Sequence, residues 1–184
     1  MTRIDFNSST FKGFEDKEDI LLDTGIILAF LNSKDAWHKT VSELFSNHII
    51  DNDNVIFLYV NPTSVNEVTF LSDKPLQRYA ERTGLNITNE DILKSGKDTV
   101  EGLKKLIDSE IVFILEGNKE SVLKQLSIYE KLGDADAVYA SIANEYGISF
   151  LTVDNRLVNN MFSIHNELNQ IKNVYYTVPT YREY

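Results

Sequence analysis

The sequence predicts a three-layer α/β/α sandwich built on a mainly parallel sheet of about five strands. Short apolar runs of strand length alternate along the chain with segments whose apolar residues have helical spacing. The runs are apolar at consecutive positions, which is typical of strands covered on both faces. The chain has 184 residues, 42% of them hydrophobic, so it can bury a core and is expected to form a single domain.

The first part of the chain is expected to supply two of the strands. Residues 1–18 are polar and charged, and we expect them to form an N-terminal arm outside a domain of residues 19–184. A strand is expected at residues 20–22. A helix is expected at residues 37–45, because the apolar residues there recur at helical spacing. The next strand covers residues 54–60, which are rich in Val, Ile, Phe and Tyr.

The middle of the chain is more polar and is expected to be helical. A break that contains proline follows the second strand, and Thr63 or Ser64 is expected to cap a helix that runs through Leu71. The segment that follows has no apolar run of strand type. We therefore expect a helical insertion near residues 72–108.

The last part of the chain returns to alternating strands and helices. Gly133 precedes a helix that begins at Asp134, and Gly147 stands where a helix C-terminal glycine belongs. Strands are expected at residues 111–115, 148–153 and 174–177, and helices at residues 119–132, 134–146 and 155–168.

Composition excludes several kinds of chemistry. The absence of cysteine excludes disulfides, thiolate zinc sites and cysteine nucleophiles. The three histidines, at positions 38, 48 and 165, show no close ligand spacing, so a bound metal would have to be a hard ion held by oxygen. A formal charge of −10 disfavours general nucleic-acid binding but allows a local basic face. No signal-peptide or membrane-spanning run occurs, so we expect a cytoplasmic protein without a membrane partner.

Carboxylates are expected to collect at one edge of the sheet. Asp23 and Asp154 come directly after two strands, and parallel sheets bind ligands beyond the carboxyl ends of their strands. Glu67 lies on the helix after another strand, and Asp134 and Asp136 open a later helix. Acids placed so close together raise one another's pKa and are tolerated where they share a cation. Mg²⁺ or Mn²⁺ suits such a pocket and could activate a water for phosphodiester cleavage.

Each acid also has a plainer interpretation. An aspartate at a strand end, such as Asp23 or Asp154, is often a turn former or a helix cap. Asp134 follows a glycine at a helix start and is expected to be an N-cap rather than a ligand. Asp136 could merely favour the helix dipole, and Glu67 is one acid among many. The constellation is more specific than any of its members.

Four short segments carry these acids in a characteristic order. They are Leu21-Leu22-Asp23-Thr24-Gly25-Ile26-Ile27-Leu28, Thr63-Ser64-Val65-Asn66-Glu67-Val68, Asp136-Ala137-Val138-Tyr139-Ala140-Ser141-Ile142-Ala143 and Ile148-Ser149-Phe150-Leu151-Thr152-Val153-Asp154. In order and spacing they resemble PIN domains, a family of metal-dependent ribonucleases that includes toxins of toxin–antitoxin pairs. The resemblance spans about residues 20–177. It departs from the family at Gly25, where Asn is common, and in the length added near 72–108.

The resemblance implies an endoribonuclease that hydrolyses RNA with a water bound to Mg²⁺ or Mn²⁺. The catalytic and metal-binding acids that it implies are Asp23, Glu67, Asp136 and Asp154. Supporting residues, among them hydroxyls that would orient the acids, would be Thr24, Asn66, Asp134 and Thr152. The substrate would be RNA, and the resemblance leaves open an antitoxin or other protein partner and a homodimer.

Two alternatives stay open. In the first, the acids are relics and the chain is a catalytically inactive module that binds RNA or protein. In the second, Asp23-Thr24-Gly25 is the catalytic turn of an aspartic protease, which it also resembles. Those proteases are all-β, however, and a helical pattern follows Gly25 here.

A local excess of positive charge falls in the expected insertion. Residues 74–105 contain seven basic and five acidic residues, a balance of +2 against −12 in the rest of the chain. A solvated helical face and a phosphate-contacting track explain this equally well. The predicted RNA-contacting residues are Lys94, Lys97, Lys104 and Lys105. If that track fails, the substrate is expected to be held near Lys34, Lys39 and Arg156.

Overall fold

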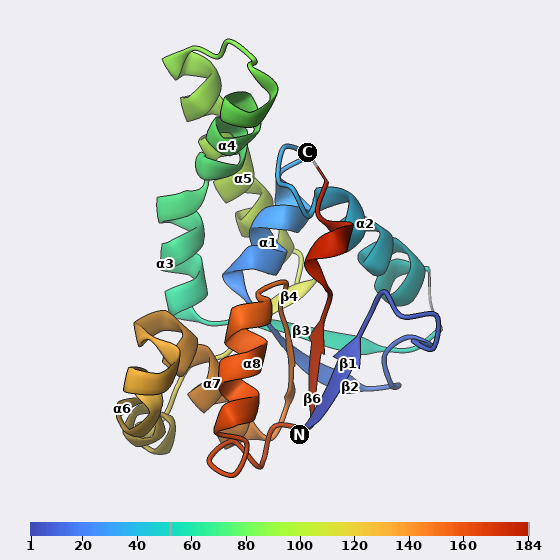
Figure 1. Ribbon diagram of the computed structural model, residues 1–184, viewed down its shortest axis with the longest axis vertical. Helices are drawn as coiled ribbons and strands as arrows, with labels where there is room; N and C mark the ends of the chain where they lie inside the picture. The colour runs from blue at the N-terminus through green and yellow to red at the C-terminus, as the bar shows by residue number, and fades with distance from the viewer. Residues whose placement is uncertain (52, 184) are drawn as a thin grey trace.

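The computed structural model describes residues 1–51 and 53–183, which form a parallel sheet between two groups of helices (Figure 1). The strands are β1 (Thr2–Asp5), β2 (Glu18–Leu22), β3 (Ile56–Val60), β4 (Val112–Ile114), β5 (Ser149–Leu151) and β6 (Asn173–Tyr176). Their order in the sheet is β1-β6-β5-β2-β3-β4, and every neighbouring pair is parallel. The predicted fold class is confirmed, with one more strand than the sequence indicated.

The helices stand where the sequence predicts them. They are α1 (Thr24–Leu31), α2 (His38–Phe45), α3 (Pro62–Leu71), α4 (Lys74–Thr83), α5 (Asn89–Asp108), α6 (Lys119–Leu132), α7 (Asp134–Tyr146) and α8 (Asn155–Ser163). A single π-helical turn, Ser46–Ile50, extends α2, and a short 3₁₀ helix, Pro179–Tyr181, follows β6. No helix in the described part of the chain is both long and apolar enough to cross a membrane.

Alternation along the strands divides the core into two parts. Ile20 and Leu22 of β2 point into the cluster formed with α1, α2 and α5, whereas Leu21 points into the cluster formed with α6, α7 and α8. All three side chains are almost fully buried. Because successive side chains of a strand point to opposite faces, a strand covered on both sides must be apolar throughout.

The first strand was missed by the sequence analysis. Residues 2–5 pair in parallel with β6, so Arg3 lies opposite Val174. Phe6 and Phe14 then pack into the core and are 4% and 3% exposed. The expectation that residues 1–18 form an arm is therefore wrong. β1 is a short edge strand with half-exposed side chains, so its position depends on pairing with a distant segment and gives no apolar run.

Two helix caps also differ from the predictions. The side chain of Asn61 accepts the N–H of Ser64 at 2.9 Å and caps α3, with Pro62 in the first turn, so neither Thr63 nor Ser64 is the cap. At α7 the N-cap is Gly133, whose φ of +98° suits a glycine. The expectation that Asp134 caps this helix is wrong, because its exposed side chain makes no capping hydrogen bond.

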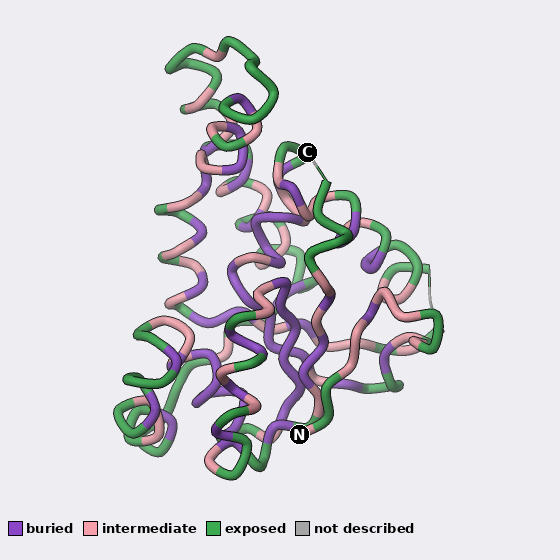
Figure 2. Tube along the Cα trace, viewed as in Figure 1, coloured by how far each residue is buried: buried purple, intermediate pink, exposed green. Residues whose placement is uncertain are grey.

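The topology places a site above β2 and β5. The chain proceeds from β2 to β3 and β4 on one side, and then returns across β2 to β5 and β6 on the other. Adjacent parallel strands whose connections leave in opposite directions open a crevice at their carboxyl ends. Residues 72–108 form α4 and α5 without a strand, and the far end of this pair is mostly exposed (Figure 2).

Candidate active site

A cleft of about 490 Å³ lies beyond the carboxyl ends of β2 and β5. Four elements each bring one carboxylate to it: Asp23 follows β2, Glu67 lies on α3, Asp136 lies in the first turn of α7, and Asp154 begins α8. These are the four acids that the sequence predicts for one edge of the sheet. The structure brings all of them together.

Asp23 is the most buried of the four, with 7% of its surface exposed. Its carboxylate accepts a hydrogen bond of 2.6 Å from the hydroxyl of Thr152. Burial raises its pKa to about 7, and repulsion by Asp136, Asp154 and Glu67 adds to the effect of burial. Although Asp23 occupies the N-cap position of α1, its side chain makes no capping hydrogen bond and lines the cleft instead.

Asp154 has both of the roles considered for it. Its carboxylate accepts the backbone N–H groups of Arg156 at 2.7 Å and Leu157 at 3.0 Å, so it caps α8. Its own N–H donates to the Thr152 hydroxyl at 2.9 Å, and that hydroxyl donates in turn to Asp23. Thr152 therefore fixes the two aspartates relative to one another, as the resemblance implied for it.

Glu67 is held by two hydroxyl groups. Thr24 donates to its carboxylate at 2.7 Å, and the phenol of Tyr139 donates to the same oxygen. Tyr139 is 1% exposed, and burial and the bond to Glu67 raise its pKa. The sequence analysis missed Tyr139. Its signal was the spacing from Asp136, since residues three apart lie on the same side of a helix.

Asp136 lies half-buried beside the other acids. Burial raises its pKa to about 6, repulsion by Asp154 and Glu67 raises it as well, and the charge of Arg156 lowers it. Two of the four predicted acids, Asp23 and Asp136, thus hold protons unusually well for acids. Perturbed groups of this kind in a cleft are typical of functional sites.

Gly25 is the residue at which the chain departs from the resemblance. It lines the cleft between Asp23 and Val153. A Cβ atom at this position would lie 3.1 Å from Cγ2 of Val153, which is closer than an ordinary contact. A larger residue would therefore require the side chain of Val153 to shift by a few tenths of an ångström.

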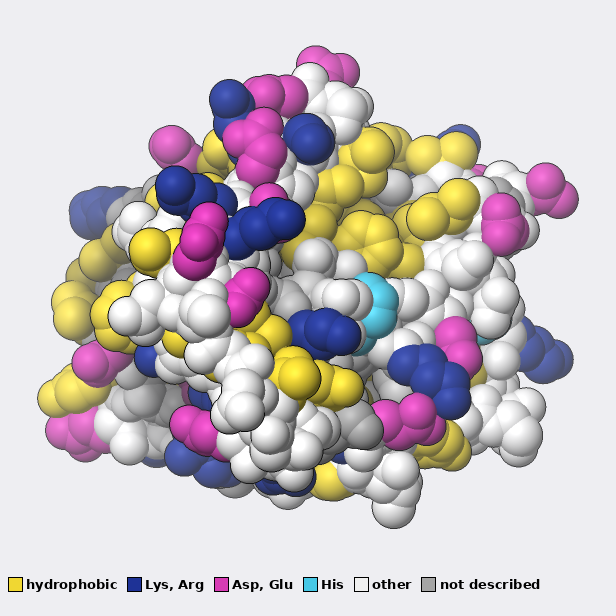
Figure 3. Space-filling model, turned by 90° about the horizontal axis from the view of Figure 1, so that it is seen from above, with side chains coloured by type: hydrophobic (Ala, Val, Ile, Leu, Met, Phe, Trp, Pro, Cys, Tyr) yellow, Lys and Arg dark blue, Asp and Glu magenta, His cyan; other side chains and the backbone are white. Residues whose placement is uncertain are grey.

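Several predicted residues lie away from the cleft. Asn66 and Asp134 are exposed and do not line it. The lysines of the predicted RNA track are exposed on α5 and do not line the cleft. They are Lys94, Lys97, Lys104 and Lys105. Seen from the end of the molecule that carries α4 and α5, basic and acidic side chains are interspersed (Figure 3).

Four other cations line the cleft itself. They are Lys34, Arg78, Arg156 and Arg182. Lys34 and Arg156 are two of the three residues expected to hold the substrate if the predicted track fails. The third, Lys39, instead pairs with Glu183 at 3.2 Å. Arg78 and Arg182 come from α4 and from the end of the chain, and no local motif marked them.

The donor set fits a hard cation in its chemistry. Besides Asp35, four carboxylates line the cleft, and two of these four have pKa values raised by burial and mutual repulsion, which a divalent cation would relieve. As the side chains lie, no group of three or more His, Cys, Asp or Glu residues in the described ranges could hold a metal ion. Binding an ion would therefore require carboxylates to turn toward it.

A comparison of the sequence with family models decides the assignment. The model of the PIN domain matches residues 20–161. The chain belongs to the PIN-domain family. PIN domains are in general nucleases that use divalent metals. The interpretation of Asp23-Thr24-Gly25 as an aspartic-protease turn is wrong, because this segment runs directly into α1 within a parallel α/β fold.

Solved structures share the fold of this PIN domain. FitAcB from Neisseria gonorrhoeae matches with a TM-score of 0.52 and 15% sequence identity, over 88% of this chain and 98% of that chain. FitAB bound to the IR36 DNA fragment matches with a TM-score of 0.51 and 15% identity, over 85% and 94%. No curated protein matches the chain in sequence.

Proposed function

We propose that this PIN domain is a divalent-metal-dependent endoribonuclease. The observation that carries the proposal is the meeting of Asp23, Glu67, Asp136 and Asp154 in one cleft, from four elements that are far apart in the sequence. Three carboxylates that repel a fourth lower the stability of the fold. Their presence in one cleft therefore indicates a function that retains them. Hydroxyl groups orient two of these acids, Asp23 and Glu67, which also favours an active nuclease over an inactive binding module.

The acids would hold Mg²⁺ or Mn²⁺. Asp23, Asp136 and Asp154 would be the ligands, and Glu67 would support the ion directly or through water. When bound, the ion would supply the positive charge that activates a water and stabilises the developing charge on the phosphate. The protein's own contribution is to orient the acids: Thr152 fixes Asp23 and Asp154 with one hydroxyl.

The cleft sets limits on the substrate. Its volume of about 490 Å³ has room for a short piece of one strand, and one of its acids, Asp23, is buried and so less accessible to a phosphate held in a rigid duplex. We therefore propose that single-stranded or unpaired RNA enters, with its flanking phosphates near the cations of the cleft. The predicted lysine track on α5 remains a second surface along which a longer RNA could extend.

Two biological settings use a nuclease of this family, a toxin opposed by an antitoxin and an RNA-processing enzyme. We infer that the protein acts in the cytoplasm in either setting. A neighbouring gene for a small DNA-binding protein would support the toxin role. Co-expression of that protein with this chain should then suppress RNA cleavage and yield a complex of the two proteins.

A cleavage assay tests the proposal. The full chain is incubated with labelled single-stranded RNA and with a hairpin, in Mg²⁺, in Mn²⁺ and in EDTA. We expect metal-dependent internal cleavage of the single strand, loss of cleavage in Asp136→Asn, and retention of cleavage in the matched control Asp134→Asn. RNA binding without cleavage in either metal would favour the inactive binding module instead.

A further inference from the structure

The end of the chain forms part of the cleft wall. After β6, residues 178–183 turn back over the carboxyl ends of the strands toward the start of α2 (Figure 1). Pro179 and Arg182 line the cleft together with the four acids. The side chains from 179 to 183 are all exposed, so the segment adds little to the core.

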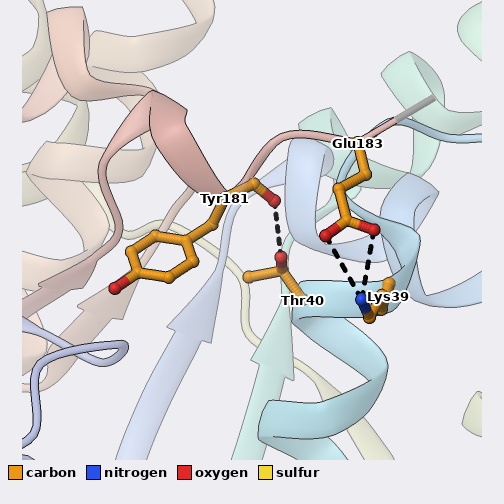
Figure 4. A network of polar contacts seen from close by, with 4 residues as sticks. All are labelled: Lys39, Thr40, Tyr181 and Glu183. Atoms are coloured by element: carbon orange, nitrogen blue, oxygen red, sulfur yellow. Dashed lines mark hydrogen bonds and ion pairs between the residues drawn. The ribbon is translucent and has the colours of Figure 1, made fainter.

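Three polar contacts hold this C-terminal segment, two on α2 and one on Ala36, which lies two residues before α2. The hydroxyl of Thr40 donates to the carbonyl oxygen of Tyr181 at 2.7 Å, and Lys39 contacts the carboxylate of Glu183 at 3.2 Å (Figure 4). The backbone N–H of Glu183 donates to the carbonyl oxygen of Ala36 at 2.8 Å. These contacts lie on either side of Arg182 and fix the backbone from which its side chain reaches the cleft.

Arg182 is one of three cations that different elements bring to the same part of the cleft. Arg78 comes from α4, and both arginines act on the carboxyl group of Asp35, whose pKa burial raises and their charges lower. Lys34, the residue before Asp35, lies over the ring of Tyr79 with its nitrogen 4.8 Å from the ring centre. Three cations and one acid, Asp35, therefore line this part of the cleft.

Charge explains why an acidic cleft needs such a wall. Five carboxylates and four cations line the cleft, and one of the four cations, Arg182, comes from the C-terminal segment. Without Arg182, a strand of RNA would meet five acids and only three cations, which is a more negative surface. A guanidinium offers paired donors that match two oxygens of a phosphate. The position of Arg182 and Arg78, which line one cleft and both act on Asp35, therefore suits a backbone phosphate next to the one that is cleaved.

We propose that the C-terminal segment is a substrate-binding wall, in which Arg182 and Arg78 contact a backbone phosphate of single-stranded RNA. Thr40 is a positioning residue, because it acts on the RNA only by holding the backbone that carries Arg182. The inference rests on the proposed function, since it concerns the substrate of the same cleft.

The test measures binding of a short labelled single-stranded RNA by fluorescence anisotropy, with Ca²⁺ in place of Mg²⁺ to prevent cleavage. Arg182→Gln is expected to weaken binding about fivefold or more and to reduce the salt slope by about 0.7, as for one lost phosphate contact. Arg182→Lys should recover part of the affinity. Lys172→Gln, an exposed charge outside the cleft walls, serves as the control and should bind as the wild type does.

Thr40→Val separates positioning from a structural role. It should weaken RNA binding about two- to threefold in the wild type but have no further effect in Arg182→Gln, because both changes act through one contact. If Arg182→Gln binds as tightly as the wild type while the wild type binds and cleaves RNA, this inference alone fails. If the wild type neither binds nor cleaves RNA, the proposed function fails and takes this inference with it.

Discussion

Strand β2 has a buried acid at each of its ends, and the two acids have opposite surroundings. Glu18 begins the strand and is 4% exposed, whereas Asp23 follows it and is 7% exposed. Each accepts a hydrogen bond of 2.6 Å from a hydroxyl of the neighbouring β5 segment, Ser149 at one end and Thr152 at the other. Burial and this bond are therefore common to both, and the remaining neighbours differ.

Glu18 is surrounded by donors. Besides Ser149, the phenol of Tyr175 donates to it at 2.9 Å, the amide of Asn173 at 3.1 Å, and the backbone N–H of Glu15 at 2.9 Å. A buried carboxylate with so many donors ties β2, β5 and β6 together at the amino end of the sheet. Such an acid has a structural explanation and no further group to bind.

Asp23 is surrounded by other acids. Thr152 is its side-chain donor, and the charges of Asp136, Asp154 and Glu67 add to burial in raising its pKa to about 7. A carboxylate in this situation is stabilised by a cation that is not part of the chain. The two ends of one strand therefore differ in their neighbours rather than in burial, and we propose that this difference separates the structural acid, Glu18, from the functional one, Asp23.

The largest expected effect is on catalysis. Asp23→Asn keeps the shape of the side chain but loses its charge, so cleavage of single-stranded RNA should fall about 1,000-fold or more. Glu18→Gln should cleave at the wild-type rate per folded molecule, because it lies at the opposite end of the strand. Initial rates in Mn²⁺ measure both, and an equal loss in the two variants would contradict the comparison.

The next effect concerns stability, and here the substitution of Glu18 should have the larger effect and that of Asp23 the smaller. Glu18→Ala leaves Ser149, Asn173 and Tyr175 without their buried acceptor and should lower the free energy of unfolding by about 3 kcal/mol or more. Asp23→Ala removes one hydrogen bond but also relieves repulsion, so its cost should stay below about 1 kcal/mol. Urea unfolding in EDTA at pH 7.5 compares them. A larger loss in Asp23→Ala would show that Asp23 is the structural acid.

The two hydroxyls of the β5 segment provide a matched pair. Thr152→Val removes the bond that orients Asp23 and should lower the cleavage rate about 10- to 100-fold. Ser149→Ala removes the equivalent bond to Glu18 and should cost about 1 kcal/mol of stability with no change in rate. Cleavage rates and urea midpoints of both variants are compared under the same conditions. Slower cleavage in Ser149→Ala would contradict the assignment of a structural role to Glu18 and a functional role to Asp23.

The smallest expected effect is in the pH dependence of stability without metal. Because the pKa of Asp23 is about 7 in the folded chain and near 4 in the unfolded chain, the folded state binds the proton more tightly. Stability should therefore fall as pH rises from about 4 to 7. Asp23→Asn should melt about 3 °C or more above the wild type at pH 8 in EDTA, and at the same temperature near pH 4. Calorimetry at several pH values measures this difference, and equal melting temperatures of Asp23→Asn and the wild type at pH 8 would contradict the prediction.

Local patterns predicted most of the architecture. Five of the six strands are recognisable because buried strands must be apolar at consecutive positions, and the acids at their ends follow from parallel topology and the resemblance. The pattern failed for β1, whose polar residues are held by pairing with β6. It also misplaced the cap of α7, where the backbone of Gly133 rather than the side chain of Asp134 starts the helix.

The sequence by itself determined the α/β alternation, the family and the four acids, because each depends on residues that are neighbours along the chain. Only the tertiary structure decided what surrounds those acids. Folding brings Tyr139 to Glu67, and both Arg78 and Arg182 to Asp35, across long separations in the sequence. The physical reason is that charge and hydrogen bonding act over a few ångströms of space, irrespective of how far apart the residues lie in the chain.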